Sequence, residues 1–297
     1  MEFAFGGLLS CGECGYTLTG AAPEGTLRLL QVHQLNQSPR PGEQRNNGPI
    51  SMNIAGGTPV DVEQPSSWPA PVLARATELA SALRGTTDHI SDLQVPDAGE
   101  DEFRALLSGR VVRAYHATRL LDHEVSMIEH SGLRLLSVKL LSDRIEAAFS
   151  NACITATERD YFHAAHVFAT HEEENRRGQT CLFLGTYVLR EDPDLLQDLL
   201  GIWGGEGMYM TSASRHAEDR LRTLGRPAVV VVDVDLSAGW STYKAWPGLQ
   251  QLFAGTLLGL QASADVFYSK PVPPRQVRAI WLPGNQEYDK FKGLPRA

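Results

Sequence analysis

The sequence is poor in cysteine, in clustered basic residues and in long apolar runs, and each shortage excludes a class of protein. Four cysteines among 297 residues are too few for a disulfide-stapled scaffold and fit a reducing compartment. The net charge is −8, and no Lys/Arg stripe of the kind that tracks a phosphate backbone is present. The sequence therefore predicts neither a disulfide-rich domain nor a strong nucleic-acid binder.

Signals for membrane targeting are equally scarce. Residues 1–9 (MEFAFGGLL) are apolar but carry neither a basic leading region nor a small-residue cleavage site, so they do not fit a signal peptide. The longest apolar runs, such as 228–232, fall far short of the roughly 18–20 residues that span a bilayer. We expect a cytoplasmic protein with no membrane partner.

Composition divides the chain into three parts. Residues 1–68 are rich in Gly, Pro, Ser, Asn and Gln, and such a segment buries too little apolar surface to offset its ordering entropy. We predict that they are mostly disordered or weakly structured, with one short apolar run, Thr26–Val32, able to pair as a strand. Residues 69–100 are predicted to be a helix (69–85) followed by a linker, and 101–297 an α+β domain.

Within 101–297, hydrophobic periodicity and Gly/Pro punctuation predict several helices and several short strands. The expected helices are 101–108, 122–130, 138–149, 158–171, 194–202 and 213–224, and the expected strands are 111–116, 180–188, 207–210, 228–236, 266–268 and 277–282. Helices gather early and strands late, which favours the α+β class over a regular βαβ alternation.

The first group of residues with chemical potential is Tyr115-His116-Ala117-Thr118-Arg119, at the end of the first expected strand. Side chains two apart on a strand point the same way. The imidazole of His116 and the hydroxyl of Thr118 can therefore grip one sugar or amide together. The alternative is a histidine that only caps a helix or satisfies backbone groups.

The second group is the glycine-rich run 203–212 (WGGEGMYMTS). Glycines let a backbone approach a ligand closely, and Tyr209 after them can stack on a flat ring. The helix expected after Ser212 can aim its N-terminus at a phosphate. The alternative is a tight turn with a tyrosine in the core.

The third group is Asp265 at the start of a strand, shortly before the stiff turn 271–274 (PVPP). A carboxylate placed there can stabilise a developing oxocarbenium ion, as acids do in glycosyl transfer. An aspartate at a strand start is also a common surface or turn residue.

Taken in chain order, these groups resemble the His–Tyr–acid branch of the ADP-ribosyltransferase superfamily. His116-Ala117-Thr118 resembles the family's HG[ST] segment, and Gly207-Met208-Tyr209-Met210 with the serines after it resembles its GxYF segment. The resemblance implies an ADP-ribosyltransferase-like split antiparallel sheet with inserted helices, preceded by a flexible N-terminal segment. The segments YHATRL, NRRGQTCLF and WGGEGMY also resemble a group of uncharacterised bacterial proteins, which implies no activity.

The resemblance also implies roles. His116 would hold the nicotinamide ribose of NAD, Tyr209 would stack on nicotinamide, and Asp265 or Glu206 would be the catalytic acid. The remaining residues expected around NAD, which is consumed as a substrate, are Thr118, Arg119, Gly207 and Ser212. The acceptor is unknown, and the pattern is compatible with a bacterial toxin, effector or defence protein.

Two other functions stay open. Ala117 stands where the family has glycine, and Asp265 where it has glutamate, so a non-catalytic module that binds a nucleotide or a protein is one alternative. The other is a metal-dependent hydrolase that uses His163, His166 and His171, because two histidines three apart on a helix can share one ion.

Overall fold

The computed structural model divides the chain into two compact units, Met1–Ala55 and Gly56–Ala297. The structure describes residues 58–85, 90, 93, 98–170, 176–191, 193–209, 217–236 and 248–295, and the backbone alone at 9–10, 17–18, 98–100, 195 and 240–242. In the first unit, the described residues are two short antiparallel strands, β1 (Leu9–Ser10) and β2 (Thr17–Leu18). The strand predicted at Thr26–Val32 lies outside the described residues.

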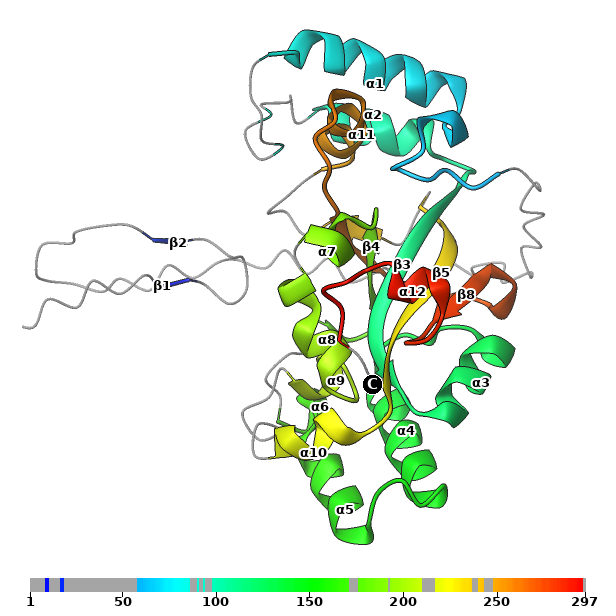
Figure 1. The fold of residues 1–297 in the computed structure, drawn as a ribbon, viewed down its shortest axis with the longest axis vertical. Helices are drawn as coiled ribbons and strands as arrows, with labels where there is room; N and C mark the ends of the chain where they lie inside the picture. Colours follow the sequence, from blue (N-terminus) through cyan, green and yellow to red (C-terminus); the bar gives the residue numbers. More distant parts are fainter. Residues whose placement is uncertain are drawn as a thin grey trace, which may run out of the picture. The chain divides into compact units, whose positions relative to one another are not determined.

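The second unit is built on a six-stranded sheet (Figure 1) in the order β6-β7-β4-β3-β5-β8, in which all neighbouring strands are antiparallel. The strands are β3 (Val111–Leu120), β4 (Thr180–Leu184), β5 (Arg226–Asp235), β6 (Trp240–Thr242), β7 (Ala264–Tyr268) and β8 (Val277–Trp281). This antiparallel sheet with many helices agrees with the α+β class expected from the sequence.

β3 and β5 form the longest strand pair of this sheet. The two strands pair in unbroken register from Val111–Asp235 to Leu120–Arg226. β5 is buried on both faces except at its ends, which explains its nearly continuous run of valines. β-branched side chains are stiff and pack well on a pleated surface.

Helices cover both faces of the sheet, and their apolar sides supply the rest of the core. Helices α1, α2 and α11 gather at one end of the unit, and α4, α5 and α10 at the other (Figure 1). The helices are α1 (Ala70–Leu83), α2 (Ala98–Leu106), α3 (Asp122–Ser131), α4 (Val138–Ser150), α5 (Ala156–Ala165), α6 (Val167–Thr170), α7 (Tyr187–Glu191), α8 (Gln197–Gly201), α9 (Glu206–Tyr209), α10 (Glu218–Thr223), α11 (Leu249–Leu258) and α12 (Gln286–Asp289). Among the described residues, no helix is long and apolar enough to cross a membrane.

Local sequence explains where the helices α4 and α5 begin. Ser137 caps α4 by accepting a hydrogen bond from the backbone N–H of Leu140, at 3.1 Å. Thr155 and Glu158 form a reciprocal capping box at the start of α5. Such caps satisfy N–H groups that the first helical turn leaves without partners.

The predicted strand at 207–210 is wrong where the structure describes it, because Glu206–Tyr209 is the helical turn α9. Gly204 and Gly205, both with positive φ (+96° and +53°), form the turn that leads into it. The helical turn buries Met208 to 1% exposure among the side chains between α4 and α10. Tertiary packing therefore overrides the strand-like pattern.

Two other predictions need correction. The strand predicted at 180–188 ends at Leu184, and α7 begins at Tyr187. The predicted boundary between flexible and folded chain at residue 69 lies too late. Val60 pairs in parallel with Val112 of β3, and the indole of Trp68 donates to the Asp61 carbonyl at 2.7 Å. These apolar residues are too widely spaced in a polar segment to give a periodic signal.

The helix predicted at 69–85 is confirmed as α1, but it belongs to the main unit rather than to a separate linker region. Its apolar side packs with α11 in the core on one face of the sheet. No element was predicted at 249–258. α11 is buried along most of its length, so its sequence carries little of the polar–apolar alternation that marks a surface helix.

Candidate functional site

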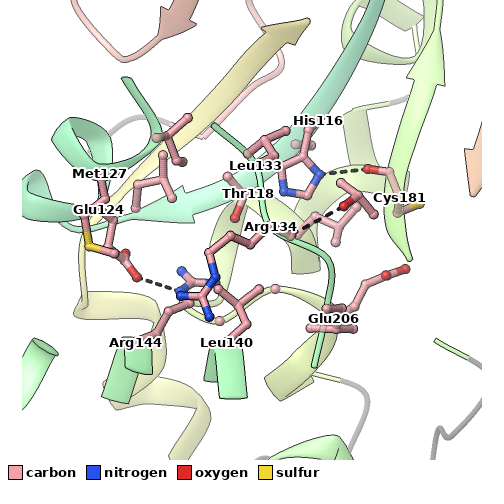
Figure 2. Close-up of a pocket in the computed structure, with 18 of the residues that line it drawn as sticks. His116, Thr118, Glu124, Met127, Leu133, Arg134, Leu140, Arg144, Cys181 and Glu206 are labelled. Carbon is pink, nitrogen blue, oxygen red and sulfur yellow. Dashed lines mark hydrogen bonds and ion pairs between the residues drawn. The ribbon is translucent and has the colours of Figure 1, made fainter. Parts of the chain in front are cut away.

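The candidate site lies where the sheet splits between β3 and β4. These two strands share a single residue pair, Tyr115 with Phe183, whereas the neighbouring β3–β5 and β4–β7 pairs run along whole strands. Just beyond that pair, Nδ1 of His116 lies 2.8 Å from the backbone oxygen of Cys181. A side chain thus replaces the strand pairing, and a cavity of about 120 Å³ opens beside it (Figure 2).

Several segments line this cavity. β3 contributes His116 and Thr118, β4 contributes Cys181, and the Gly204-Gly205-Glu206 turn closes one side. The remaining walls come from α3, from the extended segment 131–136 and from α4. A pocket of this size admits a single ring or sugar, so a larger ligand must extend from it toward solvent.

His116 is a neutral hydrogen-bond acceptor toward the cavity. Because the Cys181 carbonyl can only accept, Nδ1 carries the proton and Nε2 keeps its lone pair. Burial lowers the pKa of His116, and the positive charge of Arg144 lowers it further. The hydrogen bond to the Cys181 carbonyl opposes this shift in part. A neutral imidazole with a free acceptor nitrogen suits a ligand hydroxyl.

Thr118 lies two residues along β3, on the same side as His116, as the alternation of side chains predicts. The turn at Gly205 approaches it closely, since a Cβ added to Gly205 would lie 3.9 Å from the Thr118 hydroxyl. The glycine-rich run therefore brings its backbone against the cavity.

Glu206 and Cys181 are the polar groups at the β4 side of the cavity. Burial raises the pKa of the Cys181 thiol, and the nearby carboxylates of Glu206 and Asp265 raise it further, while Arg176 opposes them. Arg176 lies 4.0 Å from Glu206 and stacks on the ring of Phe267, 4.3 Å from its centroid. Two carboxylates from distant parts of the chain thus act on one partly buried thiol.

A charged network of Glu124 and Arg144 forms the opposite side of the cavity. Glu124 is 4% exposed and accepts hydrogen bonds from Arg144 Nε (2.6 Å), Trp203 Nε1 (2.9 Å) and the backbone N–H of Leu121 (2.8 Å). Burial by itself would raise the pKa of Glu124, but the charge and hydrogen bonds of Arg144, with those of Leu121 and Trp203, lower it. Glu124 is therefore ionised. Asp122-His123-Glu124 was expected to open a helix, and nothing in the sequence pointed to Arg144 twenty residues on.

The structure gathers some of the predicted residues and separates others. His116, Thr118 and Glu206 line one cavity. Arg119 does not, because its buried guanidinium donates to the carbonyls of Leu224 (2.7 Å) and Leu200 (3.3 Å) and ties β3 to neighbouring segments.

Tyr209, Gly207 and Asp265 lie near the cavity but not in its wall. Tyr209 packs against the apolar cluster around Trp203. Burial raises the pKa of its phenol, with smaller contributions from Glu206 and Cys181. Asp265 lies on β7 with solvent access, but surrounding protein atoms desolvate its carboxylate and raise its pKa, and Arg176 opposes this shift. Ser212 lies outside the described residues.

The three histidines of the metal-hydrolase alternative do not gather in the described part of the chain. His163 pairs with Glu146 at 2.8 Å on the surface. His166 follows the end of α5, and its Nδ1 accepts a hydrogen bond from the Ala169 backbone. His171 lies outside the described residues, and elsewhere no three His, Cys, Asp or Glu side chains cluster as metal ligands would.

Comparison with known proteins adds no relative: no family model, no curated protein and no solved structure matches the chain.

Proposed function

We propose that this protein binds NAD at the β3–β4 split and transfers its ADP-ribosyl group to an acceptor. The observation that carries the proposal is the convergence of three residues, distant in sequence, on one cavity: the neutral imidazole of His116, the hydroxyl of Thr118 and the carboxylate of Glu206. His116 supplies a hydrogen-bond acceptor, Thr118 a hydrogen-bond donor and Glu206 a negative charge. These groups suit a ribose that becomes cationic during the reaction. The antiparallel sheet is compatible with the resemblance noted in the sequence.

In this reaction the bond between the anomeric carbon of ribose and the nicotinamide nitrogen breaks. Both bonding electrons go to nicotinamide, which leaves as a neutral molecule, and the ribosyl group becomes an oxocarbenium ion. The acceptor forms the new bond to the anomeric carbon and gives up its proton. A fixed carboxylate is worth most when it faces charge that develops only in the transition state.

We assign the role of that carboxylate to Glu206 rather than to Asp265, because Glu206 lines the cavity and Asp265 does not. Asp265 would act only indirectly, through the electrostatic effect of its carboxylate on the Cys181 thiol. His116 would accept a hydrogen bond from a ribose hydroxyl through Nε2. Tyr209, on the same helical turn as Glu206, would support that turn by packing against the core.

The test is nicotinamide release from NAD by the full chain, with and without candidate acceptors. We expect His116→Ala and Glu206→Gln each to lower the rate at least tenfold. His130→Ala is the matched control, because His130 is exposed on α3 and bonds only the Ser126 carbonyl among the described residues. Wild-type rates in both site variants would refute the assignment.

A second candidate is a module that binds NAD or ADP-ribose without turnover. Among the described residues, the cavity wall contains no aromatic ring besides the imidazole of His116, so nothing there stacks on nicotinamide. Titration calorimetry with NAD and ADP-ribose distinguishes the two functions. Binding without nicotinamide release would favour the module, and a bacterial toxin, effector or defence role would then need a partner protein instead of an acceptor.

A further inference from the structure

The guanidinium of Arg144 is held rigidly at the wall of the cavity. Arg144 lies on α4 with its side chain 15% exposed. Its Nε donates to Glu124 at 2.6 Å, one Nη donates to the Arg119 carbonyl at 3.3 Å, and the group lies 5.4 Å from the Trp203 ring centroid. These contacts come from three different segments, so they fix both the position and the tilt of the planar group.

These contacts use only some of the N–H donors of Arg144. A guanidinium has five N–H donors, and the hydrogen bonds above use two of them. Both oxygens of Glu124 accept hydrogen bonds, one from Arg144 and the other from Trp203 and Leu121. These bonds occupy three of the roughly four acceptor sites of a carboxylate, so Glu124 mainly orients the arginine.

Two groups of polar side chains line the cavity from different sides. Arg144 with Glu124 lies on one side and Glu206 with Cys181 on the other (Figure 2). Between them lie the neutral His116 and apolar side chains such as Leu133 and Leu140. Arg134 also lines the cavity, and its charge is paired with Asp143 at 2.8 Å. The low polarity of this lining strengthens the interaction of either group with a ligand charge.

We propose that Arg144 binds a phosphate group of the ligand and so sets its orientation, with the cationic nicotinamide ribose directed toward Glu206. A preoriented guanidinium matches a phosphate with two parallel N–H···O bonds. This inference rests on the proposed function, because a dinucleotide carries positive charge at its nicotinamide end and negative charge at its pyrophosphate. No motif in the sequence marks Arg144 for this role.

The test compares ligands with and without phosphate in the same protein variant. Binding of ADP-ribose, of nicotinamide riboside and of inorganic pyrophosphate to the full chain is measured by calorimetry. In Arg144→Gln we expect ADP-ribose and pyrophosphate to bind at least tenfold more weakly, while the riboside, which has no phosphate, changes less than twofold. Arg144→Lys should lose part of the affinity, since an ammonium keeps the charge but not the paired donors.

Arg159→Gln is the matched control: Arg159 lies on α5, pairs with Asp160 and is not part of the cavity wall. The riboside serves as an internal check on folding, because a misfolded variant loses all three ligands. Equal weakening of riboside and ADP-ribose in Arg144→Lys, or unchanged pyrophosphate binding in both Arg144 variants, overturns the proposal. If wild type binds pyrophosphate through Arg144 but binds no nicotinamide compound, the phosphate site stands and the proposed function fails.

Discussion

Replacing Glu124 by glutamine should destabilise the protein strongly, although the shape of the side chain hardly changes. The carboxylate is buried and accepts hydrogen bonds from Arg144, Trp203 and Leu121. A glutamine amide offers one oxygen and one NH₂, so at least one donor must lose its acceptor. Arg144 would also keep its charge with no anion beside it.

The magnitude follows from these two losses. Removing one partner of a buried ion pair costs about 3–5 kcal/mol. Arg144 retains some contact with the cavity, where its side chain is 15% exposed, and glutamine leaves no void. We therefore expect the free energy of unfolding to fall by about 2–4 kcal/mol at pH 7.

The effect should depend on pH with a definite sign. Because the pKa of Glu124 is lowered below its usual 4.5 in the folded protein, its ionised form stabilises the fold above that value. This contribution disappears as pH falls through the folded pKa. The difference between wild type and Glu124→Gln should therefore be largest near pH 7 and shrink below about pH 4.5.

Urea unfolding followed by tryptophan fluorescence measures both quantities, at pH 7 and at steps down to pH 4. Glu129→Gln is the control, because Glu129 is exposed on the same helix, α3, and should change stability by less than about 0.5 kcal/mol. The reasoning fails if Glu124→Gln matches Glu129→Gln at pH 7. It also fails if the difference between Glu124→Gln and wild type stays constant across the pH range.

Three further predictions concern groups around the cavity. Gly132→Ala should lower the free energy of unfolding by more than about 2 kcal/mol, because the new Cβ would lie 1.9 Å from the Val272 carbonyl oxygen in a backbone with φ +78°. In the control Gly109→Ala, φ is similar but the space is open, so thermal unfolding should show a loss of only about 1 kcal/mol. By NMR, His116 should titrate below its usual 6.5, and a midpoint above 6.5 would contradict this. Because the unfolded chain binds the proton more readily, the contribution of neutral His116 to stability is complete above 6.5 and is lost as the pH falls from 6.5 through the lower folded pKa. Cys181, whose pKa burial raises, should react with iodoacetamide at pH 8 far more slowly in native than in urea-unfolded protein, as followed by peptide mass spectrometry; equal rates would show that the thiol is not protected.

Elements with strong local signals could be predicted from the sequence. The β-branched run expected as a strand at 228–236 forms most of β5, and the helix expected at 122–130 is α3, which ends before Gly132 with its positive φ. The helical turn α9 could not be predicted, because its conformation depends on packing of Met208 against side chains distant in the chain. The same limitation applies to Val60, which lies in a segment predicted to be flexible but pairs with β3.

The site shows the same division. The sequence by itself determined which residues have suitable chemistry and placed His116 and Thr118 on one face of a strand, because strand alternation is a local property of the backbone. Only the tertiary structure decided that Glu206 shares their cavity, that Asp265 lies outside its wall and that Arg144 faces it. Those relations depend on where β3 and β4 separate and on long-range hydrogen bonds, and neither leaves a periodic trace in the chain.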